Sequence, residues 1–213
     1  GLTGKPLGAM LTHRNLYTQS NLLEGIYGGT HESRSLAMIP LYHSFGATAN
    51  MLAPLRTGAA IVLMDRFTLD GIFQTLERHR VSYLCAVPRL FLGMYLHEGA
   101  EKYDLSALKF CITGGAAIPP EYITQFEDRF RIPLREGYGL TEAAPICSVV
   151  RLEKMQKVGS IGTVIPGTEA KVFDEDDREV PRGVEGELVI RGDNVMKGYY
   201  KAPEATARVL RGG

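Results

Sequence analysis

The first eight residues, Gly-Leu-Thr-Gly-Lys-Pro-Leu-Gly, have the composition of a phosphate-binding turn. Backbone N–H groups can approach an anion closely where glycine carries no side chain, and Thr3 and Lys5 add a hydroxyl and a cation on either side of Gly4. The segment is not a Walker P-loop, because Pro6 follows Gly4-Lys5 where that motif requires Ser or Thr. A plain terminal turn is the alternative, and these residues alone do not decide between the two.

A second segment, Glu136–Glu142 (Glu-Gly-Tyr-Gly-Leu-Thr-Glu), offers groups that suit a nucleotide. The glycines on both sides of Tyr138 expose its ring as a stacking platform. Thr141 supplies a hydroxyl and Glu142 a hard oxygen ligand, a pair that fits a phosphate–magnesium group. The alternative is a turn that leads into a helix N-terminus, where a glutamate is favourable for its charge alone.

Two further segments each follow an apolar run. Pro40–Gly46 contains His43 and ends on a glycine that can open a helix, whereas Thr113–Pro119 has small side chains that leave room for a flat ring or a chain. Ligands of open α/β sheets lie outside the carboxyl ends of the strands, so both segments are candidates for binding. The alternatives are a histidine whose hydrogen bonds are satisfied at a strand end and an ordinary β-to-α turn.

Short apolar runs alternate with amphipathic stretches between residues 35 and 137, and they would place these segments at strand ends. The runs are rich in Ile, Val, Leu, Met or Cys, which favours strands buried on both faces of a parallel sheet. The predicted strands are residues 35–40, 59–64, 82–87 and 109–113, with a shorter extended piece at 133–136. The predicted helices are residues 13–27, 68–80, 88–97 and 119–130, with Thr12 and Thr68 as N-caps. This alternation predicts an α/β fold with an open, mostly parallel sheet, flanking helices and right-handed crossovers.

The sequence changes in character after about residue 150, where glycine and proline become frequent. Two alternating runs, residues 169–173 and 187–191, are joined by the acidic turn 174–177 and predict an antiparallel β unit. Residues 203–210 predict a last short helix. We therefore expect an α/β subdomain over residues 1–155 and a smaller β-rich subdomain over residues 156–213.

Composition limits the classes of function. Lys plus Arg and Asp plus Glu both number 24 among the 213 residues, and this neutral balance argues against nucleic acid as a partner and against an electrostatic membrane anchor. The sequence has no apolar run of the roughly 18 residues that a transmembrane segment needs, no signal peptide, and no GxSxG or HExxH motif. The three cysteines lack CxxC spacing and predict reduced thiols in a cytoplasmic protein. Peripheral membrane contact and a homo-oligomer both stay open.

Taken together and in this order, the segments resemble the adenylate-forming superfamily, which includes acyl-CoA synthetases, peptide-synthetase adenylation domains and luciferases. Within this resemblance, the Tyr-Gly-Leu-Thr-Glu element at residues 138–142 is specific, and Asn194–Tyr200 is most similar to long-chain fatty acyl-CoA ligases. The matching stretches cover nearly the whole chain: residues 3–15, 40–46, 114–116, 136–142, 159–162, 186–192 and 194–200.

The resemblance implies an enzyme that joins an acid to a thiol. ATP and a carboxylic acid, here a fatty acid, would give an acyl-adenylate and pyrophosphate, and coenzyme A would then take the acyl group. Carboxylate attack on the α-phosphorus requires the protein mainly to position the reactants and neutralise charge.

The resemblance also assigns roles to residues. The implied nucleotide-binding residues are Thr3, Gly4 and Lys5 in the phosphate loop, Gly115, Ala116 and Ala117 beside adenine and the acyl pocket, and Glu136, Gly137, Tyr138, Gly139 and Thr141. Within this set, Tyr138 would stack on adenine and Thr141 would contact phosphate. Glu142 would hold Mg²⁺. The implied acyl-channel residues near the reacting carboxylate are His43, Phe45, Gly46 and Gly115.

Two departures from the family pattern bear on this interpretation. Leu7 stands where the family loop commonly has a lysine, and the loss of one charged contact would weaken nucleotide binding by about 1.5–3 kcal/mol. The chain also stops before the Thr-Gly-Asp segment and the small C-terminal domain with its catalytic lysine. We therefore expect a fragment of the large N-terminal domain, incomplete at both ends and unable to form a thioester alone. A non-catalytic nucleotide-binding or scaffold module and an adenylation domain that loads a carrier protein are the alternative functions.

Overall fold

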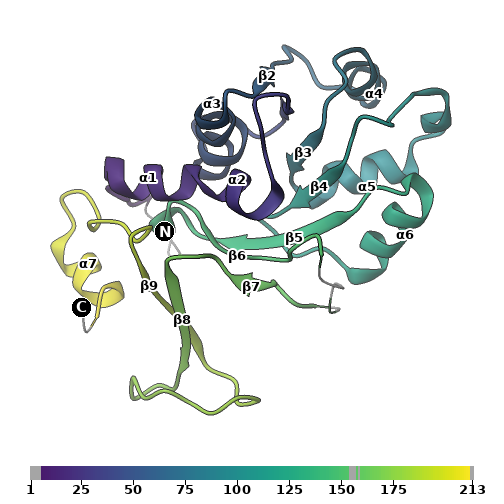
Figure 1. The fold of residues 1–213 in the computed structure, drawn as a ribbon. Helices are drawn as coiled ribbons and strands as arrows, with labels where there is room; N and C mark the ends of the chain where they lie inside the picture. The colour runs from purple at the N-terminus through teal and green to yellow at the C-terminus, as the bar shows by residue number, and fades with distance from the viewer. Residues whose placement is uncertain (1–5, 154–156, 158, 212–213) are drawn as a thin grey trace.

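Seven strands form the central sheet of the computed structural model, which describes residues 6–153, 157 and 159–211. The strands are β1 (Arg34–Ala37), β2 (Ala60–Val62), β3 (Tyr83–Ala86), β4 (Phe110–Thr113), β5 (Leu134–Gly139), β6 (Ile146–Val149) and β7 (Thr163–Val164). Their order is β2-β1-β3-β4-β5-β6-β7, and the pairs from β2 to β5 are parallel whereas β6 and β7 join antiparallel (Figure 1). The predicted open, mostly parallel sheet is confirmed.

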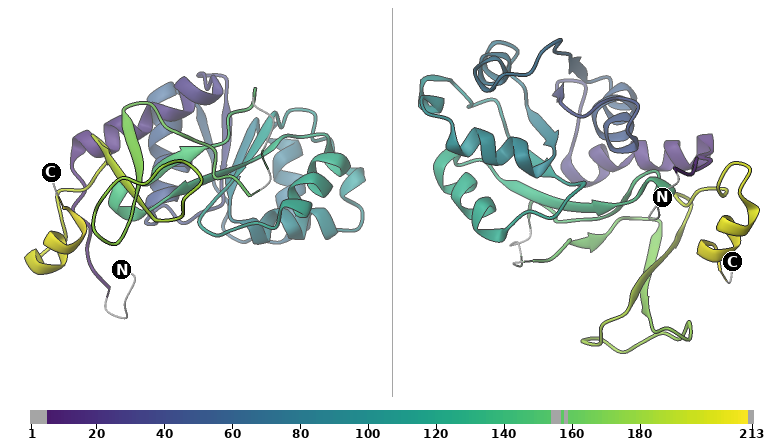
Figure 2. Two further views of the ribbon diagram at one scale, coloured as in Figure 1. Left: turned by 90° about the horizontal axis from the view of Figure 1, so that it is seen from below. Right: turned by 180° about the vertical axis from the view of Figure 1, so that it is seen from behind.

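Helices cover both faces of this sheet (Figures 1 and 2). One face carries α4 (Leu69–Arg78), α5 (Pro88–Leu96) and α6 (Pro120–Phe130), and the other carries α2 (Leu22–Tyr27), the π-helix η1 (Gly46–Leu52) and α3 (Ala53–Thr57). Leu84 of β3 packs against the first group, and its neighbours Tyr83 and Cys85 pack against the second. This arrangement explains the continuous apolar runs, because successive side chains of a central strand meet a hydrophobic layer on either side.

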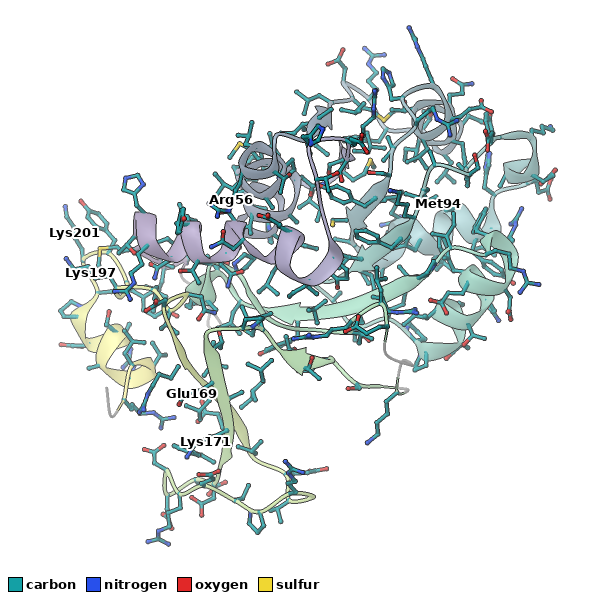
Figure 3. The ribbon with its side chains drawn as sticks, viewed as in Figure 1. Arg56, Met94, Glu169, Lys171, Lys197 and Lys201 are labelled. Atoms are coloured by element: carbon teal, nitrogen blue, oxygen red, sulfur yellow. The ribbon has the colours of Figure 1, made fainter. Side chains whose placement is uncertain are left out.

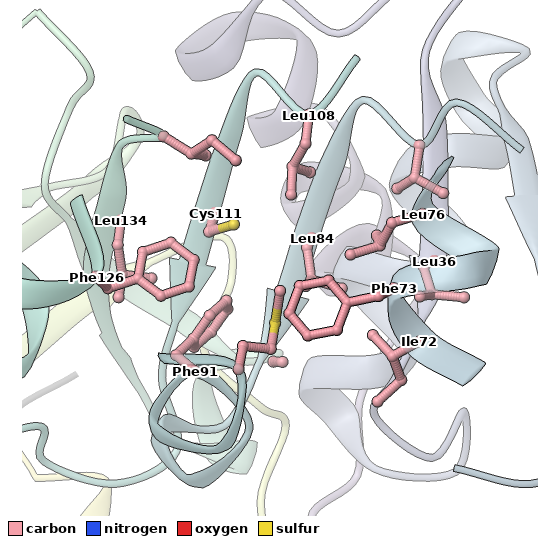
Figure 4. Packing of buried hydrophobic residues seen from close by; sticks show 14 of the residues in the cluster. Leu36, Ile72, Phe73, Leu76, Leu84, Phe91, Leu108, Cys111, Phe126 and Leu134 are labelled. Atoms are coloured by element: carbon pink, nitrogen blue, oxygen red, sulfur yellow. The ribbon is translucent and has the colours of Figure 1, made fainter. Parts of the chain in front are cut away.

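The larger core lies between the sheet and α4, α5 and α6 (Figure 4). Phe73 of α4 is fully buried, and Phe91 of α5 meets Phe126 of α6 edge to face with ring centroids 5.5 Å apart. Leu84 and Leu134 enter the same layer from β3 and β5. Burial of each such side chain contributes about 1.5–3 kcal/mol, so this layer holds the central strands in place.

The helix predicted over residues 13–27 is two helices, α1 (His13–Ser20) and α2, so that prediction is wrong in its length. Thr12 caps α1 as predicted, because its hydroxyl accepts the Asn15 N–H at 3.2 Å while the Asn15 side chain accepts the Thr12 N–H at 2.7 Å. Asn21 ends α1 as its C-cap, which fits the weak helix propensity of asparagine. Thr68 caps α4 as predicted, because its hydroxyl accepts the Gly71 N–H at 3.1 Å, without the reciprocal side-chain bond that Asn15 makes to Thr12.

Several elements were not predicted: β6, β7, α3 and the short 3₁₀ helix η2 (Ala100–Lys102). The helix that Gly46 was expected to open is the π-helix η1, and the alternative helix start at the end of residues 136–142 is the 3₁₀ helix η3 (Thr141–Ala143). Most are too short to show a periodic pattern, and η1 is built from small side chains that give little amphipathic contrast. β7 follows residue 155 in the chain but pairs with β6, which precedes it. The expected division of the chain near residue 155 stays a prediction.

The predicted antiparallel unit is present as β8 (Thr168–Phe173) and β9 (Glu187–Gly192), which project away from the central sheet (Figures 1 and 2). The acidic turn 174–177 does not by itself join them, contrary to expectation, because the connection runs over residues 174–186. Asp174 Oδ1 accepts the N–H groups of Asp176 and Arg178 at 3.0 and 2.9 Å, which closes a local turn before the chain reaches β9. The last predicted helix is α7 (Pro203–Val209). None of the helices in the described residues has the length and apolarity that a membrane crossing requires.

Candidate functional site

A cavity of about 200 Å³ opens where the segments after β1, β4 and β5 meet beside η1. The residues predicted from the sequence that line it are His43, Phe45, Gly115, Gly137, Tyr138, Gly139 and Thr141. The predicted residues that do not line it are Gly46, Ala116, Ala117, Glu136 and Glu142. Thr3, Gly4 and Lys5 lie outside the described residues. Segments far apart in the sequence therefore converge on one cavity.

The turn after β1 positions His43 and Phe45 at this cavity. The His43 N–H donates to the Pro40 carbonyl at 2.9 Å, and His43 Nδ1 accepts the Phe45 N–H at 3.1 Å. Gly46 is buried in this turn, and a Cβ there would lie 2.3 Å from the Pro40 carbonyl oxygen. Gly46 therefore shapes the backbone that presents His43 instead of lining the cavity itself.

The segment after β4 brings backbone close to the same cavity. A Cβ on Gly114 would lie 3.1 Å from the Gly137 carbonyl oxygen and 3.4 Å from the Phe45 ring, so the three segments pack against one another here. Gly115 has φ +82°, a conformation that favours glycine. Ala116 and Ala117 follow as exposed residues on the way to α6. A flat ligand at this place would contact backbone more than side chains.

Tyr138 lies near the end of β5, where the strand pairing with β6 shifts between Tyr138 and Gly139. Gly139 permits this shift, because a Cβ there would lie 2.1 Å from the Pro145 carbonyl oxygen. Partial burial raises the pKa of the Tyr138 hydroxyl, so the ring stays neutral and suited to stacking. Burial likewise raises the pKa of Glu136, against the opposing effect of a hydrogen bond with the Ile118 backbone.

Thr141 and Glu142 follow in the 3₁₀ helix η3. The Thr141 hydroxyl lies 3.3 Å from the Ser44 hydroxyl, so two hydroxyl groups stand together at the cavity edge. The Glu142 carboxylate is half-buried, and its Oε1 accepts the Tyr199 hydroxyl at 2.6 Å. Burial, and after it the hydrogen bond to Glu142, raises the pKa of Tyr199 to about 12. The Tyr199 hydroxyl therefore keeps its proton and is the donor.

The chemistry of this corner fits Mg²⁺ held together with substrate phosphates. No group of three or more His, Cys, Asp or Glu side chains within the described residues could hold a metal ion. Mg²⁺ in nucleotide sites usually takes one or two carboxylates, phosphate oxygens and water, and does not need an all-protein cage. Glu142 follows Thr141 directly in η3 and supplies a carboxylate near the cavity edge at which the Thr141 and Ser44 hydroxyls lie.

Sequence reasoning missed several residues that shape the site. Gln19 is fully buried, and its amide group donates to the Ile146 carbonyl at 2.8 Å and accepts the Ile146 N–H at 3.2 Å. Tyr27 lines the cavity and donates to the Val150 carbonyl at 3.2 Å. Nothing in the pattern of α1 marks Gln19, whereas Tyr199 lies in a stretch that the family resemblance already included.

These features define a class of protein, an α/β adenylate-forming domain with its candidate site at the strand ends. A family model described as "AMP-binding enzyme" matches residues 1–200, and the chain belongs to this family. It is 34% identical over its whole length to a long-chain-fatty-acid–CoA ligase of Bacillus subtilis and 36% identical to a feruloyl-CoA synthase of an Amycolatopsis species. The ATP-bound crystal structure of MatB from Rhodopseudomonas palustris superimposes with a TM-score of 0.88 at 26% identity over 96% of this chain.

The chain spans only part of these relatives. It covers 39% of the Bacillus ligase, 43% of the feruloyl-CoA synthase and 40% of MatB. The named ligase and synthase differ in the acid that their names state.

Proposed function

We propose that the protein containing this chain activates a fatty acid with ATP and transfers the acyl group to coenzyme A. The observation that carries this proposal is the convergence of His43, Tyr138 and Thr141 on one cavity from three separate segments. A stacking ring, a hydroxyl and an apolar interior in one cavity match the three parts of an acyl-adenylate. The MatB structure, which contains bound ATP, supports a nucleotide as a ligand of this fold.

The chain's own residues would chiefly orient the reactants. In the first step a carboxylate oxygen attacks the α-phosphorus, the bond to the oxygen that bridges to the β-phosphorus breaks, and pyrophosphate leaves with the electron pair. Tyr138 would stack on adenine, Thr141 would donate to phosphate, and His43 would lie near the reacting carboxylate. In the second step the thiolate of coenzyme A attacks the acyl carbon, and AMP leaves.

Glu142 would hold Mg²⁺, which supplies neutralisation of the phosphate charge when it is bound. The position of Glu142 immediately after Thr141 in η3 supports this assignment. Because Thr141 lines the cavity, a phosphate that it contacts would lie beside Glu142. The positions of Thr3, Gly4 and Lys5 relative to that phosphate remain part of the proposal.

The acyl group is proposed to be apolar because of the residues that line the cavity. Ile26, Ala49, Ile112 and Val149 are among its apolar lining residues. The polar side chains of Gln19, Tyr27 and Thr48, which also line it, already bond to backbone carbonyls. A buried polar substituent on the acid would find few free partners, which costs binding free energy. This favours a hydrocarbon acyl group.

The test is pyrophosphate release by the full-length protein with MgATP and a panel of acids that includes saturated fatty acids, ferulate and sulfoacetate. We expect the highest kcat/KM for a fatty acid and acyl-CoA as the product when coenzyme A is added. Preference for ferulate or sulfoacetate would contradict the fatty-acid assignment alone. Absence of pyrophosphate release with every acid would favour the non-catalytic module, and acyl transfer only to a carrier protein would contradict coenzyme A as acceptor.

The metal assignment has its own variant. Glu142→Ala should lower turnover by at least about 100-fold, the upper end of what residues that merely support a metal ligand cost. Glu175→Ala is the matched control, because Glu175 is exposed in the connection between β8 and β9. Equal turnover in the two variants would overturn the role of Glu142.

A further inference from the structure

The hydrogen bond from Tyr199 to Glu142 joins parts of the chain that are 57 residues apart. Tyr199 is 8% exposed, and its hydroxyl lies 2.6 Å from Glu142 Oε1. The same stretch contacts the Glu142 main chain, because the Met196 N–H donates to the Glu142 carbonyl at 2.7 Å. Glu142 is thus held at its backbone by Met196 and at its side chain by Tyr199.

The backbone of Tyr199 is itself fixed. Its N–H donates to the Thr206 hydroxyl at 2.8 Å, and Tyr199 forms an antiparallel bridge with Ala9. Three backbone hydrogen bonds extend this pairing: Met10 N–H to Gly198 at 2.8 Å, Lys197 N–H to Met10 at 2.9 Å and Tyr200 N–H to Gly8 at 2.7 Å. Lys197 and Lys201 lie in this stretch near α7 (Figure 3). We name residues 196–200 the brace.

The brace connects two parts of the candidate site. Residues 8–10 continue the chain from the glycine-rich segment, which ends at Gly8, and the brace pairs with them. The brace also contacts Glu142 through Met196 and Tyr199. A shift of the brace would therefore change the distance between the chain that leaves the glycine-rich segment and the carboxylate of Glu142.

We propose that Tyr199 is a positioning residue that orients the Glu142 carboxylate for Mg²⁺ and that the brace fixes this carboxylate relative to residues 8–10; this inference rests on the proposed function. The Tyr199 hydroxyl bonds Oε1, and within the described residues no hydrogen bond is recorded at Oε2. Oε2 is then available as a monodentate ligand, the usual way in which a carboxylate meets Mg²⁺. Partners that orient metal ligands in this manner typically contribute 10- to 100-fold in metal affinity.

The experiment compares Tyr199→Phe with Tyr200→Phe in the full-length protein. Both substitutions remove one hydroxyl from adjacent residues, but the Tyr200 side chain is 61% exposed. Mn²⁺ binding is titrated by electron paramagnetic resonance with a non-hydrolysable ATP analogue present. We expect the Mn²⁺ Kd of Tyr199→Phe to rise about 10-fold and that of Tyr200→Phe to stay unchanged. In steady-state kinetics, the Mg²⁺ concentration for half-maximal activity should rise for Tyr199→Phe, and saturating Mg²⁺ should restore most of kcat.

Other outcomes separate this inference from the function on which it rests. If Glu142→Ala weakens Mn²⁺ binding and Tyr199→Phe leaves it unchanged or tightens it, the positioning role is overturned while the metal assignment stands. If Glu142→Ala also has no effect on Mn²⁺ binding, the metal assignment itself fails. A double variant adds a check that does not depend on general stability: in the Glu142→Ala background, Tyr199→Phe should cause no further loss, and an additive loss would contradict the proposal.

Discussion

The central sheet and the β8–β9 hairpin differ in how deeply their residues are buried. Every residue of β3 and β4 is buried, whereas no residue of β8 or β9 is. The sheet is held by packing on both faces, and the hairpin mainly by its own cross-strand hydrogen bonds. Among the described residues, those that line the cavity come from the central sheet, from the turns at its strand ends and from the helices that cover it. The candidate site therefore lies in the part of the fold that is packed on both faces.

The chain beyond the hairpin, unlike the projecting strands, is hydrogen-bonded to the α/β part. Asn15 of α1 donates its side-chain amide to the carbonyls of Asp193 and Val195 at 2.7 and 2.9 Å. Asn194, which is fully buried, accepts the Thr168 hydroxyl at 2.9 Å. The segment that returns from β9 is thus tied to the α/β part at the start of the brace. The comparison shows that the C-terminal region contributes to the site through its return segment and not through its projecting strands.

The largest contrast is expected from removing one side chain in each region. Phe73→Ala empties a fully buried position and should destabilise the α/β part by about 3–5 kcal/mol. Leu188→Ala in β9, where the side chain is 39% exposed, should cost about 1 kcal/mol or less. Native-state hydrogen exchange measured by mass spectrometry resolves the two regions. Faster exchange in β3 and β4 is expected only for Phe73→Ala, and similar losses in both variants would contradict the contrast.

A second contrast lies within the α/β part, between a glycine at the site and a glycine on its surface. Gly46→Ala would place a Cβ 2.3 Å from the Pro40 carbonyl oxygen and should destabilise by about 1–3 kcal/mol. Gly25→Ala in α2 meets no atom within 4 Å and should stabilise by about 0.5–1 kcal/mol, because alanine is the better helix former. Thermal melting measures whether each substitution lowers or raises the melting temperature. A melting temperature of Gly46→Ala equal to that of the unaltered protein would show that this turn can relax.

The parts of this structure that the sequence predicts are those with a repeating physical cause. Continuous apolar runs such as residues 82–87 predict central strands, because both faces of those strands are covered. Threonines before amphipathic stretches predict helix starts, and Thr12 and Thr68 both cap helices as expected. The location of strand-end segments at a common cavity follows from parallel pairing, which brings all carboxyl ends to one edge.

The parts that could not be predicted depend on contacts between distant residues. Tyr199 and Glu142 are 57 residues apart, with the hairpin and the return segment between them, and no local pattern encodes such a pairing. Gln19 lies on α1, where nothing local distinguishes a buried amide from an exposed one. The length of the connection 174–186 could not be predicted, because its acidic residues close a local turn before the chain reaches β9.

The smallest effect is expected from an ion pair on the hairpin. Lys171 Nζ lies 2.6 Å from Glu179 Oε2, and both side chains are about half exposed, with Lys171 on the projecting strand (Figure 3). Exposed ion pairs contribute about 0.2–1 kcal/mol and are screened by salt, so Lys171→Gln should lower stability by no more than this, and less at 1 M salt than at 0.05 M. The measurement is hydrogen exchange of the β8 and β9 amides at the two salt concentrations. A loss as large as that from Phe73→Ala, or one that salt leaves unchanged, would mean that the hairpin depends on this contact as the sheet depends on its core.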